Sequence, residues 1–370
     1  MELLDEQKKS SPILNIVKIL GILVMLYLFI LAIKLMGASF KGFGKGFSEA
    51  LVSSTSNPIV GLFVGILATS IIQSSSTTTS MLVALVASGQ MPFSVAIPMV
   101  MGANIGTAVT NAIVSLTHIS RPDEFKKAFS GAIVHDYFNI FAVAAIFPIE
   151  YFFHPLEKLT RWLAGVSSEV AGVDLTSGGP LKAIIDPVKH LIVDATGETY
   201  WLTLIIAFVL LFVALRYLVK LMRSLVIDRF EGVLHNYLFK TPVRAFILGI
   251  IFTAIVQSSS ITTALVVPLL GSGLLTLEQI FPYTLGANVG TTVTALLAAL
   301  AAGTPAGMAV AFTHLFFNVF GIAIFYPLRK LPLALARKTG ELVMKHRFLA
   351  IVLILLLFFI IPGAVILLLG

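Results

Sequence analysis

The chain of 370 residues contains one long segment twice. Residues 57–118 align with residues 241–302 at a constant offset of 184 without a gap, and 24 of the 62 paired positions are identical. The match continues with small shifts on both sides, so the repeat is about 120–140 residues long and its two copies cover most of the chain. Internal repeats of this length in a hydrophobic chain are typical of secondary transporters.

The composition excludes a soluble globular protein. Hydrophobic residues make up 58% of the chain and charged residues 12%, whereas soluble domains carry about 25% charged residues. Because one spanning helix takes about 20 apolar residues, the length allows roughly ten membrane crossings. The chain has no cysteine, which excludes disulfides, thiolate metal sites and cysteine nucleophiles. We attribute the net charge of +7 to basic loops beside membrane lipid, and not to nucleic-acid binding.

The apolar pattern predicts an all-α polytopic membrane protein, in which each copy forms a helix, a hairpin, an interrupted helix and a further helix. In the first copy these elements fall at 12–36, 57–89, 92–118 and 125–153. In the second copy they fall at 200–224, 241–272, 276–302 and 306–328. A last apolar segment at 348–369 is an extra C-terminal helix. The first helix is too long for the core of a cleaved signal, so we expect it to be retained.

These elements divide the chain into four parts. Residues 1–153 hold an N-terminal segment and the first copy, and residues 200–328 hold the second copy. Residues 154–199 are predicted to form an extracytoplasmic connection with short amphipathic helices. Residues 329–370 are predicted to form a basic cytoplasmic loop followed by the last transmembrane helix.

Basic residues predict the orientation of these parts. If the hairpins do not cross the membrane, each copy crosses three times, and the two copies have inverted topology. With a cytoplasmic N-terminus the inside regions hold 17 Lys and Arg residues, Lys8, Lys9 and Lys240 among them, and the outside regions hold 7. This bias favours a cytoplasmic N-terminus in a multi-pass protein of the cytoplasmic membrane.

Each hairpin carries the signals of two short helices rather than one long one. Asn57-Pro58 and Thr241-Pro242 each combine an N-cap residue with proline at the first helical position. The middle of both hairpins reads QSSS-x-TT, which continues a spanning helix poorly. We therefore predict re-entrant hairpins with a polar break at mid-membrane, a structure that survives only inside protein or beside a water-filled cavity.

The segments around the breaks are polar but almost free of charge. No charged residue lies between Gly61 and Ser120, and only Glu278 is charged between Ala245 and Leu328. The N–H groups that begin the second half of a broken helix favour an anion, and the carbonyls that end the first half suit a small cation such as Na⁺. Because no Lys or Arg is present to neutralise a buried anion, the neutralising cation must travel with it. This argues for cation-coupled uptake rather than an anion channel.

Polar residues in membrane helices also have purely structural roles. Serine and threonine often hydrogen-bond between helices, and Gly-Ala pairs allow close packing. Because QSSS and GANxGT occur together in both copies, we favour ion binding there. We expect His135 and His314 to pack and to hydrogen-bond to the breaks. Carboxylates inside a span are rare and usually functional, so at Asp136 we favour an additional cation site over a salt bridge.

The duplicated motifs resemble those of a known family. QSSSTTTS with GANIGTAVTNAIVSL, then AFSGAIVHDYFN, then QSSSITTA with GANVGTTVTALLAAL are similar to the type II sodium-dependent phosphate cotransporters, and the likeness spans residues 12–328. The resemblance implies a membrane symporter that imports inorganic phosphate with Na⁺ as the coupling ion, by alternating access. It also implies inverted repeats that each contain a QSSS hairpin.

The resemblance assigns roles to particular residues. It implies phosphate at the hairpin tips, and with the GAN asparagines the candidate ligands are Gln73, Ser74, Ser75, Ser76, Thr77, Ser258, Ser259, Ser260, Asn104 and Asn288. It implies Na⁺ ligands in the second copy at Gln257, Ser258, Thr291 and Thr294, with Ala287 contributing only its carbonyl. By pseudo-symmetry Gln73, Ser74, Thr107 and Thr110 are candidates for a further ion or for phosphate.

In electrogenic family members an Asp in the HDxFN motif contributes to an extra sodium site. Asp136 and Asn139 match that motif, which favours electrogenic transport, although Ser130 stands where such members usually have Ala.

Two other functions stay open on the sequence. Hydroxyls and helix ends also suit another oxyanion or a dicarboxylate. An intramembrane enzyme with a serine nucleophile is disfavoured, because no Lys or Asp lies near either QSSS in the sequence.

Overall fold

The computed structural model describes residues 12–170, 179–233 and 241–370, and every regular element within them is helical. Lys8, Lys9 and Lys240, which contributed to the predicted orientation, lie outside these residues.

Seven helical segments in the described residues are long and apolar enough to cross a membrane. They are α1 (Pro12–Gly42), α5 (Phe93–Gly106) continued by α6 (Val109–Ser115) and η1 (Leu116–His118), α7 (Pro122–Phe153), α10 (Tyr200–Val233), α14 (Leu277–Ala302), α15 (Pro305–Phe325), and α17 (Phe348–Leu355) continued by η3 (Leu356–Ile360) and α18 (Ile361–Leu369). All seven fall where the sequence predicts crossing helices. An eighth span results if α2 (Gly44–Thr55) and α3 (Pro58–Ile72), which meet at a bend of 100°, are taken together.

The shorter helices comprise the two hairpin segments and three amphipathic helices. The first hairpin segment is α3 followed by α4 (Ser75–Ala87). The second is α11 (Pro242–Val256), α12 (Ser259–Ala264) and α13 (Val267–Gly271). The amphipathic helices are α8 (Pro155–Val170), α9 (Gly179–Ala195) and α16 (Lys330–Lys345). The first two confirm the amphipathic helices expected between residues 154 and 199.

Two expectations were wrong. The basic segment after residue 329 is not a loop, because α16 buries one face, including Leu333 and Ala336, against α7. The interruption predicted in both copies occurs only in the first, between α5 and α6, whereas α14 is continuous from Leu277 to Ala302. The glycines of the GANxGT motifs serve in helix packing, the structural role that the sequence left open for Gly-Ala pairs.

These glycines let two helix pairs touch at backbone distance. A Cβ added to Gly102 would lie 2.0 Å from the carbonyl oxygen of Leu62 on α3. A Cβ added to the equivalent Gly286 would lie 2.0 Å from the carbonyl oxygen of Phe246 on α11. Small residues permit such approach between membrane helices, so both copies lock their first hairpin helix to the GAN helix in the same way.

We expect Gly102→Ala to lower the free energy of unfolding by about 1–3 kcal/mol, because an overpacked interface forces backbone shifts. Thermal unfolding in detergent measures the effect. Gly46→Ala is the matched control, since a Cβ on this helical glycine meets nothing within 4 Å. Equal melting temperatures for the two variants would contradict the close-packing role.

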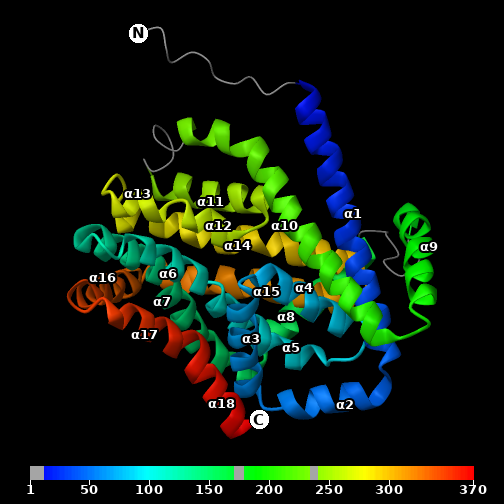
Figure 1. The fold of residues 1–370 in the computed structure, drawn as a ribbon. Helices are drawn as coiled ribbons and strands as arrows, with labels where there is room; N and C mark the ends of the chain where they lie inside the picture. The colour runs from blue at the N-terminus through cyan, green and yellow to red at the C-terminus, as the bar shows by residue number, and fades with distance from the viewer. Residues whose placement is uncertain (1–11, 171–178, 234–240) are drawn as a thin grey trace.

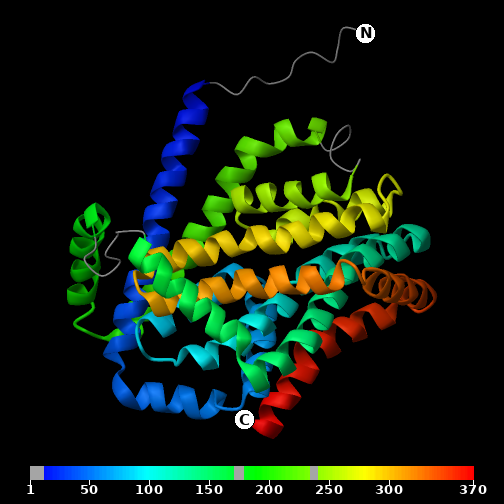
Figure 2. The same cartoon turned by 180° about the vertical axis from the view of Figure 1, so that it is seen from behind.

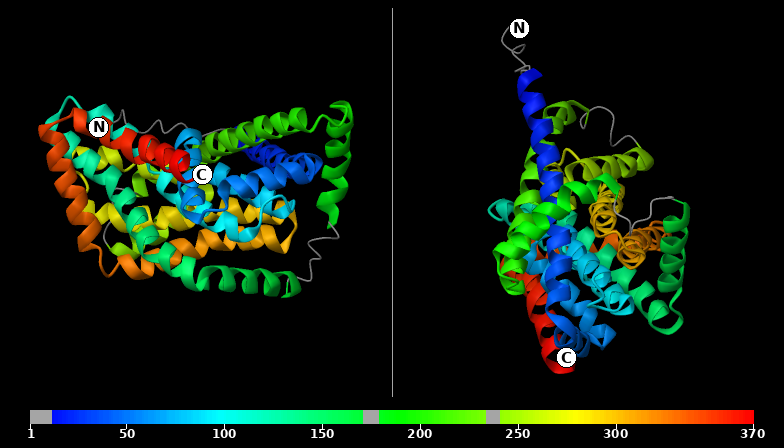
Figure 3. Two further views of the ribbon diagram at one scale, coloured as in Figure 1. Left: turned by 90° about the horizontal axis from the view of Figure 1, so that it is seen from below. Right: turned by 90° about the vertical axis from the view of Figure 1, so that its right-hand side faces the viewer.

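The two halves exchange contacts (Figure 1). Helix α1 pairs with α10 along much of its length, and α4 of the first half packs against α14 and α15 of the second. In return α12 and α13 pack against α6 and α7. Seen from behind, α14 and α15 run side by side through the middle of the molecule (Figure 2). In the right-hand view of Figure 3, the start of α1 and the end of α18 lie at opposite ends of the molecule.

Candidate functional site

Both hairpin segments break at the QSSS motif with the same backbone geometry. Gln73 ends α3 at φ 58° and ψ 28°, and Gln257 ends α11 at φ 60° and ψ 24°. The next residues, Ser74 and Ser258, are extended, with φ near −152° and −151°. A left-handed conformation is uncommon for residues other than glycine and clusters at functional sites. The polar breaks expected from the sequence are therefore confirmed.

A new helix begins at each break, and the serines of its first turn are buried. The Ser74 hydroxyl accepts a hydrogen bond from the Thr77 amide at 3.2 Å, and the Ser258 hydroxyl accepts one from the Ile261 amide at 3.3 Å. In α4 the preceding amides, those of Ser75 and Ser76, belong to the turn that has no intrahelical acceptor. A helix start of this kind attracts anions.

A chain of uncharged oxygen atoms links the two breaks. The Ser76 hydroxyl on α4 lies 3.1 Å from the Thr291 hydroxyl and 3.4 Å from the Thr294 hydroxyl on α14. Thr294 donates in turn to the side-chain oxygen of Gln257 at 2.7 Å, and the Gln257 amide nitrogen donates to the carbonyl of Ala254. The structure thus brings together Ser76, Gln257, Thr291 and Thr294 from opposite halves of the chain.

Within the part of the chain that the structure describes, the corresponding residues of the first copy make no such chain. Gln73 is exposed, whereas Gln257 is only 7% exposed. The Thr107 hydroxyl donates within its own helix to Ala103 at 2.9 Å. The Thr110 hydroxyl oxygen is buried and has no hydrogen-bond partner among the described residues. The duplicated motif therefore occupies two different environments.

Buried amides and imidazoles connect the halves beside the breaks. His135 on α7 hydrogen-bonds the side-chain oxygen of Asn288 on α14. Asn288 donates to the Asn139 side chain at 3.0 Å, and Asn139 donates to the carbonyl of Asn104 at 2.9 Å. His135 therefore contacts the GAN asparagine rather than the QSSS break that the sequence analysis expected.

The second copy makes the reciprocal contacts. His314 on α15 lies 3.3 Å from the side-chain oxygen of Asn104, and Asn318 donates to the same oxygen at 3.2 Å. The Asn104 amide nitrogen donates to Val100 at 3.0 Å. Asn104 and Asn288 thus use their amides in packing between the halves, and their role as phosphate ligands stays a prediction.

Asp136 is a buried carboxylate without partners. It is 1% exposed on α7, and neither of its side-chain oxygens has a hydrogen-bond partner in the described part of the chain. No ion pair within that part includes it, so the salt bridge weighed as an alternative is absent from the described residues. A buried, unpaired carboxylate needs an explanation, and a cation bound during transport is one.

The candidate Ala287, and Ser130, which departs from the pattern of the resembled family, both lie inside helices. Ala287 is fully buried in the continuous helix α14, where backbone carbonyls already accept helical hydrogen bonds. Its assignment to Na⁺ through that carbonyl stays a prediction. The Ser130 hydroxyl donates to the carbonyl of Lys126 at 2.7 Å, within α7.

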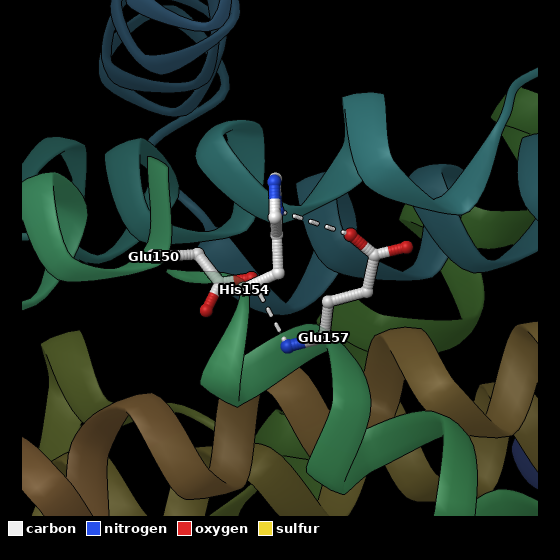
Figure 4. A group of neighbouring side chains, drawn as sticks. All are labelled: Glu150, His154 and Glu157. Atoms are coloured by element: carbon white, nitrogen blue, oxygen red, sulfur yellow. Dashed lines mark hydrogen bonds and ion pairs between the residues drawn. The ribbon is translucent and has the colours of Figure 1, made fainter. Parts of the chain in front are cut away.

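One polar cluster was missed by the sequence analysis (Figure 4). Ligating atoms of Glu150, His154 and Glu157 lie within 4.8 Å of one another where α7 turns into α8. The Glu150 carboxylate accepts the amides of Leu156 and Glu157 at 2.7 and 3.0 Å, and Arg161 pairs with Glu157 at 2.8 Å. The spacing E-x3-H-x2-E after an apolar run was the available signal. These bonds account for the cluster as a cap of α8.

Comparison with known proteins gives a consistent result. The model of the family described as Na+/Pi-cotransporter matches residues 28–177 and 210–357. Sodium-dependent phosphate transport protein 2A of Ovis aries is 31% identical, over 98% of this chain and 71% of its own length. The Rattus norvegicus 2A protein is 32% identical, over 98% of this chain and 70% of its length. The Homo sapiens 2B protein is 30% identical, over 93% of this chain and 64% of its length.

No solved structure matches the chain. The family match falls into two parts that contain one QSSS break each, which agrees with the two halves of the fold. The chain, a multi-pass membrane protein, belongs to the Na+/Pi-cotransporter family.

Proposed function

We propose that this protein imports inorganic phosphate together with Na⁺. The observation that carries the proposal is the uncharged oxygen chain from Ser76 through Thr291 and Thr294 to Gln257, which joins the two breaks. Uncharged oxygens suit a small hard cation, and the helix start beside them suits an anion. The names of its relatives, sodium-dependent phosphate transport proteins, support the same substrate pair. Family membership also favours a transporter over the serine enzyme considered from the sequence.

Binding is proposed to begin with Na⁺ at Gln257, Ser258, Thr291 and Thr294. Na⁺ is here a cotransported ion rather than a resident cofactor. Phosphate then joins the amides and hydroxyls of both QSSS tips, where the bound cation offsets its charge. This order follows because no Lys or Arg lies between Gly61 and Ser120 to hold an anion alone.

Transport is proposed to proceed by alternating access. The QSSS segments move relative to the rest of the protein, and the loaded site is closer to neutral than the site with phosphate alone. The contacts exchanged between α4 and α14–α15, and between α12–α13 and α6–α7, are the interfaces at which such a movement would occur. Na⁺ and phosphate can shift the equilibrium between the outward-open and inward-open states only if they make different contacts in these two states.

The topology is proposed to be two inverted repeats with re-entrant hairpins and a cytoplasmic N-terminus. In this arrangement residues 1–153 hold an N-terminal segment and the first repeat, and residues 200–328 are the second repeat. Residues 154–199 connect the repeats outside the cell. Residues 329–370 hold the basic helix α16 on the cytoplasmic side and the last transmembrane helix. Three crossing helices per copy and the bias of Lys and Arg support it.

Uptake of radiolabelled phosphate into proteoliposomes tests the function. We expect an inward Na⁺ gradient to stimulate uptake at least tenfold over an equal gradient of choline, since coupling requires the cation at the site. Arsenate should compete, whereas sulfate and succinate should not. Phosphate uptake at the same rate with and without Na⁺ would refute coupling. Competition by sulfate or succinate would favour a carrier of another oxyanion or of a dicarboxylate.

A further inference from the structure

The repeat contains two equivalent sets of oxygen-bearing side chains, and only one set is assembled. The assembled set consists of Ser76, Thr291, Thr294 and Gln257. Its counterparts at the offset of 184 are Ser260, Thr107, Thr110 and Gln73. In each set the serine comes from one half of the chain and the other three residues come from the other half. The Thr110 hydroxyl has no hydrogen-bond partner among the described residues, so neither Gln73 nor Ser260 bonds it there.

The helices that carry the two sets pack in the same register. A Cβ added to Gly106 would lie 2.5 Å from the carbonyl oxygen of Ile66 on α3. A Cβ added to Gly290 would lie at the same distance, 2.5 Å, from the carbonyl oxygen of Ile250 on α11. One helical turn beyond each glycine stands a threonine that is 37 positions from the glutamine of its own copy. The packing therefore places the glutamine and the threonine of each copy at the same level of their helices.

The differences between the two sets are local. Gln73 is exposed, whereas Gln257 is only 7% exposed. The helix is broken between α5 and α6 just before Thr110, whereas α14 continues through Thr294. At the break the Ala108 amide bonds a carbonyl three residues back, as in a 3₁₀ turn. One side-chain position and one turn of helix therefore distinguish the open set from the assembled one.

The open set has the groups that it needs in order to close. Burying a hydroxyl without a partner is unfavourable, so the Thr110 hydroxyl gains free energy from any acceptor that reaches it. In the assembled set the equivalent Thr294 finds that acceptor in a glutamine oxygen at 2.7 Å. Helix α12 already packs against α6, where Thr263 donates to the side chain of Asn111 at 2.9 Å. Ser260 lies one turn before Thr263 on the same helix.

We propose that Gln73 and Ser260 close onto Thr110 in the state that opens to the other side of the membrane. In the same movement Gln257 releases Thr294, and α5 and α6 become one continuous helix. The two copies thereby exchange conformations, and one of the two oxygen sets is assembled in each state. Thr110 is a positioning residue of this exchange. The proposal deepens the proposed function and rests on its alternating access, since it names the contacts that the two states exchange.

Thr110→Val tests the exchange, because its hydroxyl is unpartnered in one state and bonded in the other. In the state described here the substitution removes a buried hydroxyl without a partner, so the melting temperature should stay unchanged or rise. In the other state it removes the bond to Gln73, so Vmax of phosphate uptake should fall about tenfold. KM for phosphate should not rise, and Thr110→Ser should restore Vmax.

Three outcomes of this experiment overturn the proposal. The first is a Thr110→Val variant with the Vmax of the wild type. The second is a lower melting temperature together with a lower Vmax that Thr110→Ser does not restore, which would indicate a role in packing alone. The third is a higher KM for phosphate at unchanged Vmax, which would make Thr110 a ligand and not a positioning residue.

Hydrogen exchange in detergent, without Na⁺ or phosphate, makes a second test independent of transport. In the wild type the backbone amides of residues 107–109 should exchange faster than those of 291–293, because only the first segment contains a helix break. Thr294→Val removes the bond to Gln257, so exchange should become about tenfold slower at 107–109 and about tenfold faster at 291–293. Thr294→Ser keeps the hydroxyl and is the matched control.

The direction of the two changes decides the result. Opposite changes in the two segments support the exchange even if phosphate uptake proves independent of Na⁺ and the proposed function fails. Equal exchange in Thr294→Val and the wild type, or faster exchange in both segments, overturns the proposal even if Na⁺-driven uptake is observed.

Discussion

Gln257→Ala is expected to abolish Na⁺-driven phosphate uptake or to raise the Na⁺ concentration required by at least tenfold. The Gln257 side-chain oxygen accepts the Thr294 hydroxyl at 2.7 Å, and only 7% of the residue is exposed. The substitution removes this oxygen and leaves a buried hydroxyl without its acceptor, which costs about 1–3 kcal/mol. A loss of about 1.4 kcal/mol corresponds to tenfold in an equilibrium constant.

The strained backbone at Gln257 requires a control. The left-handed conformation costs about 1–2 kcal/mol for glutamine and for alanine alike, so only a small loss of stability is expected from the backbone. Gln73→Ala carries the same backbone at an exposed side chain and measures that loss by thermal unfolding. Thr294→Val removes the hydroxyl without touching the break, and Thr294→Ser restores it. Wild-type Na⁺ dependence in both Gln257→Ala and Thr294→Val would remove this pair from the cation site.

Asp136→Gly is expected to reduce the charge moved per phosphate while uptake continues. The carboxylate is buried on α7 without a hydrogen-bond partner among the described residues, so a cotransported cation is its proposed partner. Without the carboxylate that cation loses its site, and transport becomes less sensitive to an inside-negative potential. Uptake and current recorded together in proteoliposomes give the ratio.

A second prediction at Asp136 concerns thermal stability. Asp136→Asn should raise the melting temperature in Na⁺-free buffer, because removing an unpaired buried charge relieves its desolvation cost. Asp123→Asn, at an exposed position on the same helix, is the control for a general effect of charge. For the first prediction, an Asp136→Gly variant that moves as much charge per phosphate as the wild type would show that Asp136 has a structural role and does not bind a cotransported cation.

Much of the helical framework was predictable because its signals are local. The seven apolar segments appear as helices close to the predicted bounds. The predicted N-caps also form: the Asn57 side chain accepts the Ile59 amide at 3.0 Å, and Thr241 accepts the Arg244 amide at 3.3 Å. The breaks follow the QSSS motif, because serine offers the backbone hydrogen bonds that compete with a continuous helix.

Other features depend on neighbours that are distant in the sequence. GANIGT is followed by a break in the helix and GANVGT is not, although the two motifs differ at one position. His135 and Asn288 are 153 residues apart, and no periodicity in either segment indicates that they meet. The helical character of residues 330–345 depends on burial of its apolar face against α7.

The sequence by itself determined most of the elements: which long apolar segments are helices, where the hairpin helices are capped, and where both copies break at QSSS. Those choices depend on residues within a few positions of one another and on the need to satisfy backbone groups in lipid. The tertiary structure alone decided that Ser76 meets Thr291, that Gln257 is buried while Gln73 is exposed, and that Asp136 has no partner in the described residues. These outcomes depend on packing between the two halves. Because the two QSSS and GANxGT motifs are nearly identical, the motifs alone cannot indicate which copy packs in which way.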